Sequence, residues 1–167
     1  MNIFLVGMMG CGKTYTSKLL AQKLHYNVYD LDEIIAEKEK LSITNIFETF
    51  GETYFRRKET ETLQGLKELK NIVVATGGGT PCFHNNMNWM NEHGITVWLN
   101  EPLPVLMDRL KNEKQNRPLI KNLSNEELGL FLEKKLKERA TFYKQSQYIL
   151  SSEECLKYDF KFQITGG

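Results

Sequence analysis

The feature that most constrains the fold is the segment of residues 7–14, which reads GMMGCGKT. It matches the pattern GxxxxGK[ST], follows a short apolar run and leads into a segment of helical character, which is the context of a phosphate-binding loop. Its glycines allow close backbone approach, so that successive N–H groups surround a phosphate at the positive end of the new helix. Lys13 would then reach the β- and γ-phosphates of a nucleotide, and the Thr14 hydroxyl would bind Mg²⁺. The alternative is a glycine turn before a helix, with a coincidental Lys-Thr pair.

Short apolar runs with strand character alternate with longer segments of helical periodicity. These runs are residues 3–6, 26–29, 72–75, 95–99 and 148–150. The alternation is typical of repeated βαβ units, and the nearly continuous apolar character of the runs indicates a parallel sheet with helices on both faces. We therefore expect one α/β domain over all 167 residues.

The composition is that of a soluble globular protein, with 41% hydrophobic and 26% charged residues. A net charge of +1 provides no field that would attract nucleic acid or an anionic membrane, so we expect neither as a partner. No apolar run approaches the roughly 20 residues of a membrane span, and the first predicted strand begins too early to leave room for a signal peptide. We expect a cytoplasmic protein that acts as a monomer.

The chain has three cysteines, Cys11, Cys82 and Cys155, and three scattered histidines. An odd number of cysteines without CxxC spacing indicates neither a disulfide framework nor a zinc site. Cys11 lies inside the phosphate-binding segment, where N–H groups and Lys13 would favour its thiolate and make it a redox sensor. The interpretation that we prefer is a small side chain that fits the loop.

A long segment of residues 32–70, between the second and third predicted strands, has helical periodicity. Ser42 is the expected N-cap of a first helix, Gly51 is expected to end it, and a second helix would follow with Phe55 among its apolar residues. We interpret this insertion as a helical subdomain that holds a second substrate beside the phosphate-binding loop. Further along, Ser124 and Glu127 form a capping box that predicts the start of another helix.

Residues 111–125 are polar and contain few apolar side chains. Few buried contacts lower the free energy of local opening, so the segment fits a mobile lid over a phosphate site. On composition alone, an ordinary exposed loop fits equally well. Arg117 favours the interpretation as a lid. Phosphoryl transfer requires that water be excluded and that a positive charge be brought to the phosphoryl group during the transfer, and Arg117 could supply this charge.

Two groups of residues follow the second and third predicted strands, at the edge where an open parallel sheet binds its ligands. Asp30 and Asp32 close the second run, and alternation along a strand would place both carboxylates on one side. One carboxylate would face Mg²⁺ and the other an acceptor hydroxyl; alternatively, Asp32 only caps the helix predicted for residues 33–38. Residues 77–79 are glycines that either form a tight turn or let a ligand approach bare N–H groups.

Two arginines have both a structural and a functional interpretation. Arg56 and Glu59 lie three positions apart on one helix face, where a surface ion pair would contribute well under about 1 kcal/mol. Arg139 lies in a lysine-rich run that by itself predicts a solvated face. Arginine is also suited to bidentate binding of a carboxylate, so two arginines near one pocket would indicate a small carboxylate substrate.

Together, in this order and at this spacing, the motifs resemble those of the shikimate kinases, small phosphate-loop kinases of the aromatic amino-acid pathway. The resemblance extends from about residue 2 to residue 150 and depends on residues 7–14, 30–32, 47–52, 55–59, 77–79, 117–119, 138–139 and 143. It implies a three-layer P-loop NTPase fold of the nucleoside monophosphate kinase type, with strand order 2-3-1-4-5. It also implies transfer of the γ-phosphoryl group of ATP to the 3-hydroxyl of shikimate, with Mg²⁺ as cofactor.

The resemblance further implies roles for individual residues. Lys13, Asp32 and Arg117 would be catalytic: Asp32 would orient the acceptor hydroxyl and is the candidate for its deprotonation, and Arg117 would close with the lid onto ATP. The expected ATP-binding residues are Gly10, Cys11, Gly12, Lys13, Thr14, Tyr15, Arg109 and Arg117. The expected shikimate-binding residues are Asp32, Arg56, Gly77, Gly78, Gly79 and Arg139. Thr14 would hold Mg²⁺, with Asp30 in its outer shell.

The chain departs from the family pattern in two places. Cys11 and Thr14 replace the usual serines, and Thr14 keeps the metal-binding hydroxyl. Residues 158–164 alternate like a strand, whereas family members usually close with a helix. The sequence therefore leaves undecided whether the tail contacts adenine. Two alternative functions remain, a related kinase of another polyol acid such as gluconate and a catalytically silent kinase-like binding domain. The paired arginines and Asp32 favour shikimate, and the intact Lys13 argues against a silent domain.

Overall fold

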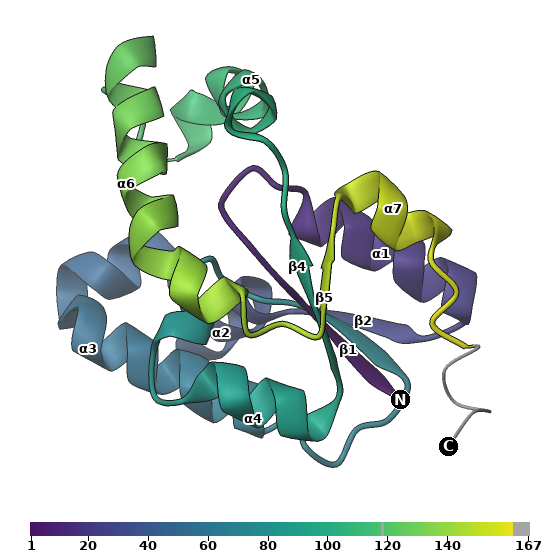
Figure 1. Ribbon diagram of the computed structural model, residues 1–167. Helices are drawn as coiled ribbons and strands as arrows, with labels where there is room; N and C mark the ends of the chain where they lie inside the picture. The colour runs from purple at the N-terminus through teal and green to yellow at the C-terminus, as the bar shows by residue number, and fades with distance from the viewer. Residues whose placement is uncertain (118, 162–167) are drawn as a thin grey trace.

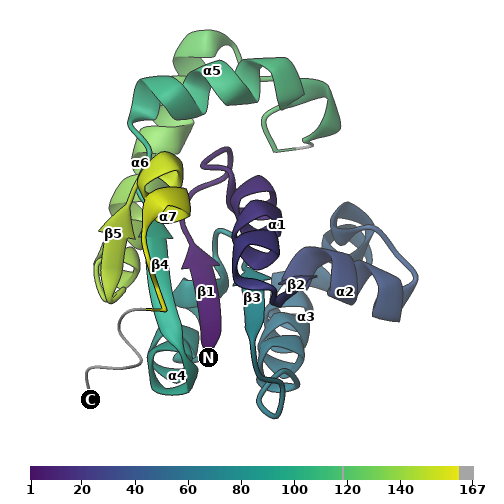
Figure 2. The same cartoon turned by 90° about the vertical axis from the view of Figure 1, so that its right-hand side faces the viewer.

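A parallel sheet forms the centre of the computed structural model, which describes residues 1–117 and 119–161. Within these residues, five strands pair in the order β2-β3-β1-β4-β5, so the predicted strand order is confirmed (Figure 1). The strands are β1 (Asn2–Val6), β2 (Asn27–Asp30), β3 (Ile72–Ala75), β4 (Ile95–Leu99) and β5 (Tyr148–Leu150). Their carboxyl ends lie at one edge, and the phosphate-binding loop of residues 7–14 leaves β1 at that edge (Figure 2).

Helices cover both faces of the sheet, which gives the three layers that the resemblance implies. The helices are α1 (Lys13–Leu24), α2 (Leu31–Glu39), α3 (Ile43–Gln64), α4 (Asn86–His93), α5 (Leu103–Glu113), α6 (Asn125–Tyr143) and α7 (Ser152–Lys157), with the short 3-10 helices η1 (Thr80–Cys82) and η2 (Lys114–Asn116). One face carries α1 and α7, and the other carries α3 and α4 (Figure 1). Figure 2 shows α5 above the phosphate-binding loop, and α6 packs against α5.

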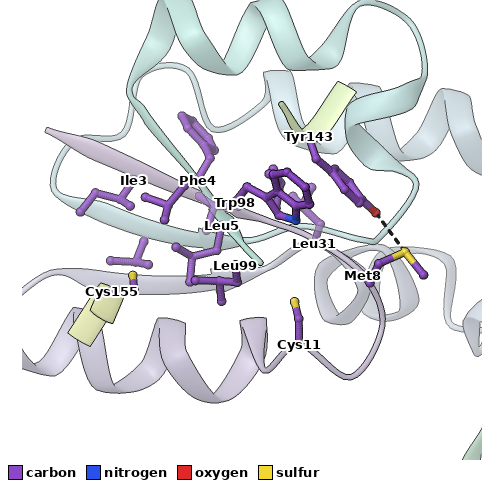
Figure 3. Close-up of a cluster of buried hydrophobic side chains, with 14 of the residues drawn as sticks. Ile3, Phe4, Leu5, Met8, Cys11, Leu31, Trp98, Leu99, Tyr143 and Cys155 are labelled. Atoms are coloured by element: carbon purple, nitrogen blue, oxygen red, sulfur yellow. Dashed lines mark hydrogen bonds between the residues drawn. The ribbon is translucent and has the colours of Figure 1, made fainter. Parts of the chain in front are cut away.

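The main core lies around β1, whose side chains are buried because strands flank it on both sides and helices cover both faces. Ile3, Phe4 and Leu5 of this strand pack beside Trp98 and Leu99 of β4 (Figure 3). The edge strands β2 and β5 differ, since their residues are only partly buried or exposed. The apolar runs at residues 3–6, 72–75 and 95–99 therefore correspond to the central strands, which are buried on both faces.

The insertion between β2 and β3 is helical, as predicted, and has a small core of its own. Ser42 caps α3 by accepting a hydrogen bond from the N–H of Asn45 at 3.1 Å. Gly51 interrupts α3 with φ 82° and ψ 172°, after which the helix continues to Gln64. Ile46 and Phe55 from the two parts of α3 bury themselves against α2, apart from the main core.

The carboxyl-terminal segment corrects one prediction and confirms another. α6 begins with the predicted capping box of Ser124 and Glu127. A second capping box at Ser151 opens α7, so a helix follows β5. The strand predicted from residue 158 is wrong for residues 158–161, because Phe160 is instead fully buried with its ring against Tyr148 (centroids 5.8 Å apart). Residues 162–164 of that prediction lie outside the described residues.

Among the described residues, no helix combines the length and apolar character that crossing a membrane requires.

Candidate active site

A cleft of about 960 Å³ lies at the carboxyl edge of the sheet. It gathers predicted site residues from five different parts of the chain, namely Gly10, Gly12, Lys13, Thr14, Tyr15, Asp30, Asp32, Gly77, Gly78, Arg109 and Arg117. The cleft lining lacks four predicted site residues, Cys11, Arg56, Gly79 and Arg139. Arg56 and Arg139 lie against Gly79 and Gly78 respectively, beside this wall. The fold thus places the phosphate-binding loop, the two aspartates and the glycine segment around one space.

The phosphate-binding loop has the backbone geometry that its glycines permit. Gly12 adopts φ 90°, a left-handed value, directly before Lys13 starts α1, so the first N–H groups of the helix face the loop. The Lys13 ammonium donates hydrogen bonds to the carbonyl oxygens of Gly7 (2.7 Å) and Met8 (3.0 Å). Its charge therefore lies at the centre of the loop, where a phosphate would be bound.

The side chain of Cys11 is fully buried under the loop, on the side of the core (Figure 3). A Cβ on Gly7 would lie only 2.9 Å from its sulfur, so the space there admits a small side chain. Cys11 does not line the cleft, and its backbone N–H donates a hydrogen bond to the Met8 carbonyl at 3.2 Å within the loop. Burial favours the packing interpretation of Cys11 over a redox sensor, since an oxidant must reach the sulfur.

Asp30 joins β2 to the loop and to α2. Its Oδ2 accepts a hydrogen bond from the Thr14 hydroxyl at 2.7 Å, and its Oδ1 accepts from the N–H groups of Asp32 (3.0 Å) and Glu33 (3.4 Å). The alternative that Asp32 caps this helix is therefore wrong, because the N-cap is Asp30. The alternation argument is also wrong, since Asp32 lies in the first turn of α2 and not on a strand. The paired hydroxyl and carboxylate oxygens of Thr14 and Asp30 are ligands that fit Mg²⁺.

The Asp32 carboxylate has an oxygen with no internal partner. Among the described residues, no group donates a hydrogen bond to its buried Oδ1. Burial raises the pKa of Asp32 from 3.8 to about 6, and repulsion from Asp30 and Glu59 adds to this against the attraction of Lys13 and Arg56. A carboxylate of this kind is well suited to accept a hydrogen bond, and then a proton, from a hydroxyl group.

Arg56 and Glu59 form a buried ion pair, so the prediction of a surface pair is wrong. Arg56 is 8% exposed and Glu59 is 0% exposed, and their side chains meet at 3.0 Å. The second oxygen of Glu59 accepts a hydrogen bond from the Thr80 hydroxyl at 2.6 Å. The Arg56 guanidinium also lies over the Phe83 ring, 4.3 Å from its centroid. These contacts hold the guanidinium in one orientation at the end of the glycine segment.

The glycine segment after β3 leaves room for both arginines. A Cβ on Gly79 would lie 2.6 Å from each terminal nitrogen of Arg56, and a Cβ on Gly78 would lie 2.8 Å from Nη1 of Arg139. The absence of side chains at Gly78 and Gly79 therefore leaves space for two guanidinium groups. The sequence analysis did not include this explanation of the glycine segment. Arg139 is half-buried and faces this segment, so the solvated-face interpretation of Arg139 is wrong. Two cations converge here in the arrangement expected for binding a carboxylate.

We expect Gly79→Ala to weaken the binding of an acidic substrate by about tenfold, because the new methyl group displaces the Arg56 guanidinium from a charge-assisted contact. Nucleotide binding should stay within about twofold of the parent, since Arg56 does not line the nucleotide cleft. Calorimetric titration of each ligand alone measures both effects. Gly129→Ala is the matched control, because its Cβ would make only ordinary contacts (3.4 Å or more, to Met107). An unchanged affinity for the acid would contradict the role given to this contact.

Tyr143 belongs to the site although sequence analysis did not assign it a role there. The buried phenol donates a hydrogen bond to the Gly78 carbonyl at 2.6 Å and lies 3.8 Å from the Met8 sulfur (Figure 3). Burial raises the pKa of the Tyr143 phenol, which keeps it a hydrogen-bond donor. Tyr143 is among the residues that carry the family resemblance, and it follows Arg139 by four positions, so both lie on the same face of α6.

Residues 111–117 and 119–125 of the segment predicted as a lid lie above the phosphate-binding loop (Figure 2). Arg117 faces the cleft, where its guanidinium pairs with Glu113 at 2.8 Å. Arg109 donates a hydrogen bond to the Gly10 carbonyl at 3.1 Å. Ile120 of this segment is fully buried in the main core, and Leu123 packs against that core. The mobility of this segment remains a prediction.

Comparisons with known proteins agree with this geometry. Residues 9–161 match the family model of shikimate kinase. A shikimate kinase of Azobacteroides pseudotrichonymphae is 46% identical over 149 residues, which cover 89% of this chain and 88% of the relative. The crystal structure of shikimate kinase from Bacteroides thetaiotaomicron has a TM-score of 0.90 at 39% identity and 94% coverage of both chains. Shikimate kinase from Acinetobacter baumannii in complex with shikimate has a TM-score of 0.85 at 32% identity, covering 98% of this chain and 93% of that chain. The chain described here belongs to the shikimate kinase family.

Proposed function

We propose that this chain transfers the γ-phosphoryl group of ATP to the 3-hydroxyl of shikimate, giving shikimate 3-phosphate and ADP, within the biosynthesis of aromatic amino acids. The observation that carries this proposal is the unpartnered carboxylate oxygen of Asp32. It lies between a phosphate-binding loop and two converging guanidinium groups. An acceptor that has both a carboxylate and a hydroxyl group fits this arrangement, and the named relatives are shikimate kinases.

At the nucleotide side, the loop N–H groups and Lys13 bind the β- and γ-phosphates. Lys13 exchanges its carbonyl partners, the oxygens of Gly7 and Met8, for phosphate oxygens, which are stronger acceptors because they are charged. Thr14 would hold Mg²⁺, with Asp30 in its outer shell, and the bound ion would neutralise charge on the phosphates. Arg117 leaves Glu113 and moves onto the transferring group as the segment above the loop closes.

At the acceptor side, Arg56 and Arg139 bind the carboxylate of shikimate and so fix the orientation of its ring. The N–H of Gly78 donates to a hydroxyl oxygen of the ring. The 3-hydroxyl then donates its hydrogen bond to Oδ1 of Asp32, which receives the proton as the hydroxyl oxygen bonds to phosphorus. The bond between phosphorus and the bridging oxygen breaks at the same stage and its electron pair leaves on ADP.

The raised pKa of Asp32 predicts the acid limb of the pH profile. Because Asp32 must be ionised to accept the proton and its pKa is about 6, kcat/KM should fall about tenfold per pH unit below pH 6 and level off above it. Initial rates between pH 4.5 and 8, with both substrates well below saturation, measure this profile. A rate that is constant through pH 6 would show that no group with this pKa limits the reaction.

The proposed function is tested by following ADP release with ATP and Mg²⁺ in the presence of shikimate or gluconate, with Lys13→Ala as the blank. We expect release that depends on shikimate. Release with gluconate alone would keep the kinase and change the acceptor. Release with neither acid would reject the kinase proposal in favour of a silent binding domain.

A further inference from the structure

One enclosed carboxylate joins three elements at the end of the cleft nearest to α7. Glu101 follows β4, and its side chain is only 8% exposed. Its Oε1 accepts hydrogen bonds from the N–H (2.8 Å) and the hydroxyl (2.5 Å) of Ser152, the first residue of α7. The same oxygen lies 4.0 Å from Nη2 of Arg109 in α5. Glu101 therefore connects the end of β4 with α5 and with the start of α7.

The partners of Glu101 are walls of the cleft. Arg109 and Ser152 both line it, and Leu156 of α7 lines it beside them. Arg109 also donates to the Gly10 carbonyl, so its guanidinium spans the distance from the phosphate-binding loop to Glu101. Figure 2 shows α7 and α2 on opposite sides of α1. Since Asp32 in α2 marks the acceptor side, the walls formed by Arg109 and Ser152 enclose the opposite, nucleoside side.

We propose that Glu101 is a positioning residue for the nucleotide, and this rests on the proposed function. Glu101 acts through its neighbours: it fixes the Arg109 guanidinium and the start of α7 at the separation that the nucleoside part of ATP requires. An enclosed carboxylate is costly unless donors surround it; Ser152 supplies both hydrogen bonds to Oε1, and the Arg109 guanidinium lies beside the same oxygen at 4.0 Å, as a charge beyond hydrogen-bond distance. Without Glu101, the start of α7 loses both hydrogen bonds and Arg109 loses the neighbouring charge while it keeps its bond to the Gly10 carbonyl, so the nucleotide must complete the ordering of both groups at the expense of its affinity.

The test compares ligand affinities of Glu101→Ala and Glu101→Gln with those of the parent. For Glu101→Ala, the Kd for ADP should rise about tenfold, as expected for the loss of charge-assisted hydrogen bonds. The Kd for shikimate should be unchanged, and kcat at saturating ATP should stay within about twofold. Glu101→Gln keeps an acceptor oxygen for Ser152 but loses the charge beside Arg109, so its Kd for ADP should be intermediate. Glu133→Gln, an exposed residue paired with Lys137 on α6, is the matched control.

Calorimetric titration with ADP alone gives the decisive measurement, with thermal unfolding as a check that each variant is folded. If both Glu101 variants bind ADP as tightly as the parent, the proposal is wrong. It is also wrong if the affinities for ADP and shikimate fall together, which would indicate a general structural role. If Glu101→Ala does not fold, Glu101→Gln decides between these outcomes. Because ADP binding requires no acceptor, the result holds even if turnover of shikimate is not observed.

Discussion

Lys13→Ala is expected to lower kcat by about 10³-fold while shikimate binding is retained, because the variant loses the side-chain cation at the centre of the phosphate-binding loop. The ammonium lies at hydrogen-bond distance from two loop carbonyls, so a phosphate bound by the loop lies within its reach. Single-turnover measurements at saturating ATP separate this loss from weaker nucleotide binding. Lys38→Ala, on the exposed end of α2, is the matched control.

The same substitution also tests the loop itself. The Lys13 ammonium satisfies the carbonyls of Gly7 and Met8, which in the variant turn to water because the loop borders the cleft. Thermal unfolding should therefore shift by only a few degrees, as a loss of about 1 kcal/mol would cause. Turnover in Lys13→Ala within about tenfold of the parent would contradict the assignment of Lys13 to the transferring phosphate.

Asp32→Asn is expected to lower kcat by about 10³-fold and at the same time to stabilise the fold at neutral pH. The loss of turnover follows from the loss of the proton acceptor. The gain in stability follows from the pKa, which rises from 3.8 to about 6 on folding, so the folded state disfavours the ionised carboxylate that is present at pH 7.5. Each unit of this shift corresponds to about 1.4 kcal/mol, so an asparagine should add about 2 to 3 kcal/mol to the free energy of unfolding.

The sign of this effect fixes its dependence on pH. Between pH 3.8 and about 6 the folded chain binds more protons at Asp32 than the unfolded chain, so the stability of the parent falls as the pH rises through this range. The advantage of Asp32→Asn should therefore be full above pH 6 and should disappear below pH 3.8. Urea unfolding at pH 7.5 and at pH 3.5 measures it, with the exposed Asp108→Asn as control. A variant no more stable than the parent at pH 7.5 would show that Lys13 and Arg56 already compensate the charge.

The fold was predictable from the sequence because its signals are local. The phosphate-binding loop is a continuous pattern, and apolar runs buried on both faces stand out against segments of period 3.6. The second capping box, Ser151 to Glu154, is an equally local signal for α7, but the sequence analysis did not consider it. In the described part of the alternation after residue 158, Tyr158 and Phe160 are aromatic rings packed on Tyr148 and are not part of a strand.

The site was less predictable where it depends on contacts between distant segments. Arg56 and Glu59 resemble an ordinary surface pair until the fold places Thr80 and Phe83 over them. The role of Tyr143 depends on a carbonyl 65 positions away. Glu101 carries no motif at all, and its importance follows from the approach of Ser152 and Arg109, which no local pattern records.

The course of α6 has a mechanical consequence. This helix begins at the end of the segment proposed as a lid and ends at Tyr143, with Arg139 one turn before. Its 19 residues make a stiff rod about 28 Å long. A tilt of the helix at its amino-terminal end would displace Arg139, the proposed carboxylate-binding cation, near its other end. One helix thus joins the proposed lid on the nucleotide side to the proposed binding site of the acid. By thermodynamic linkage, binding of either substrate should therefore alter the affinity of the protein for the other substrate by the same factor.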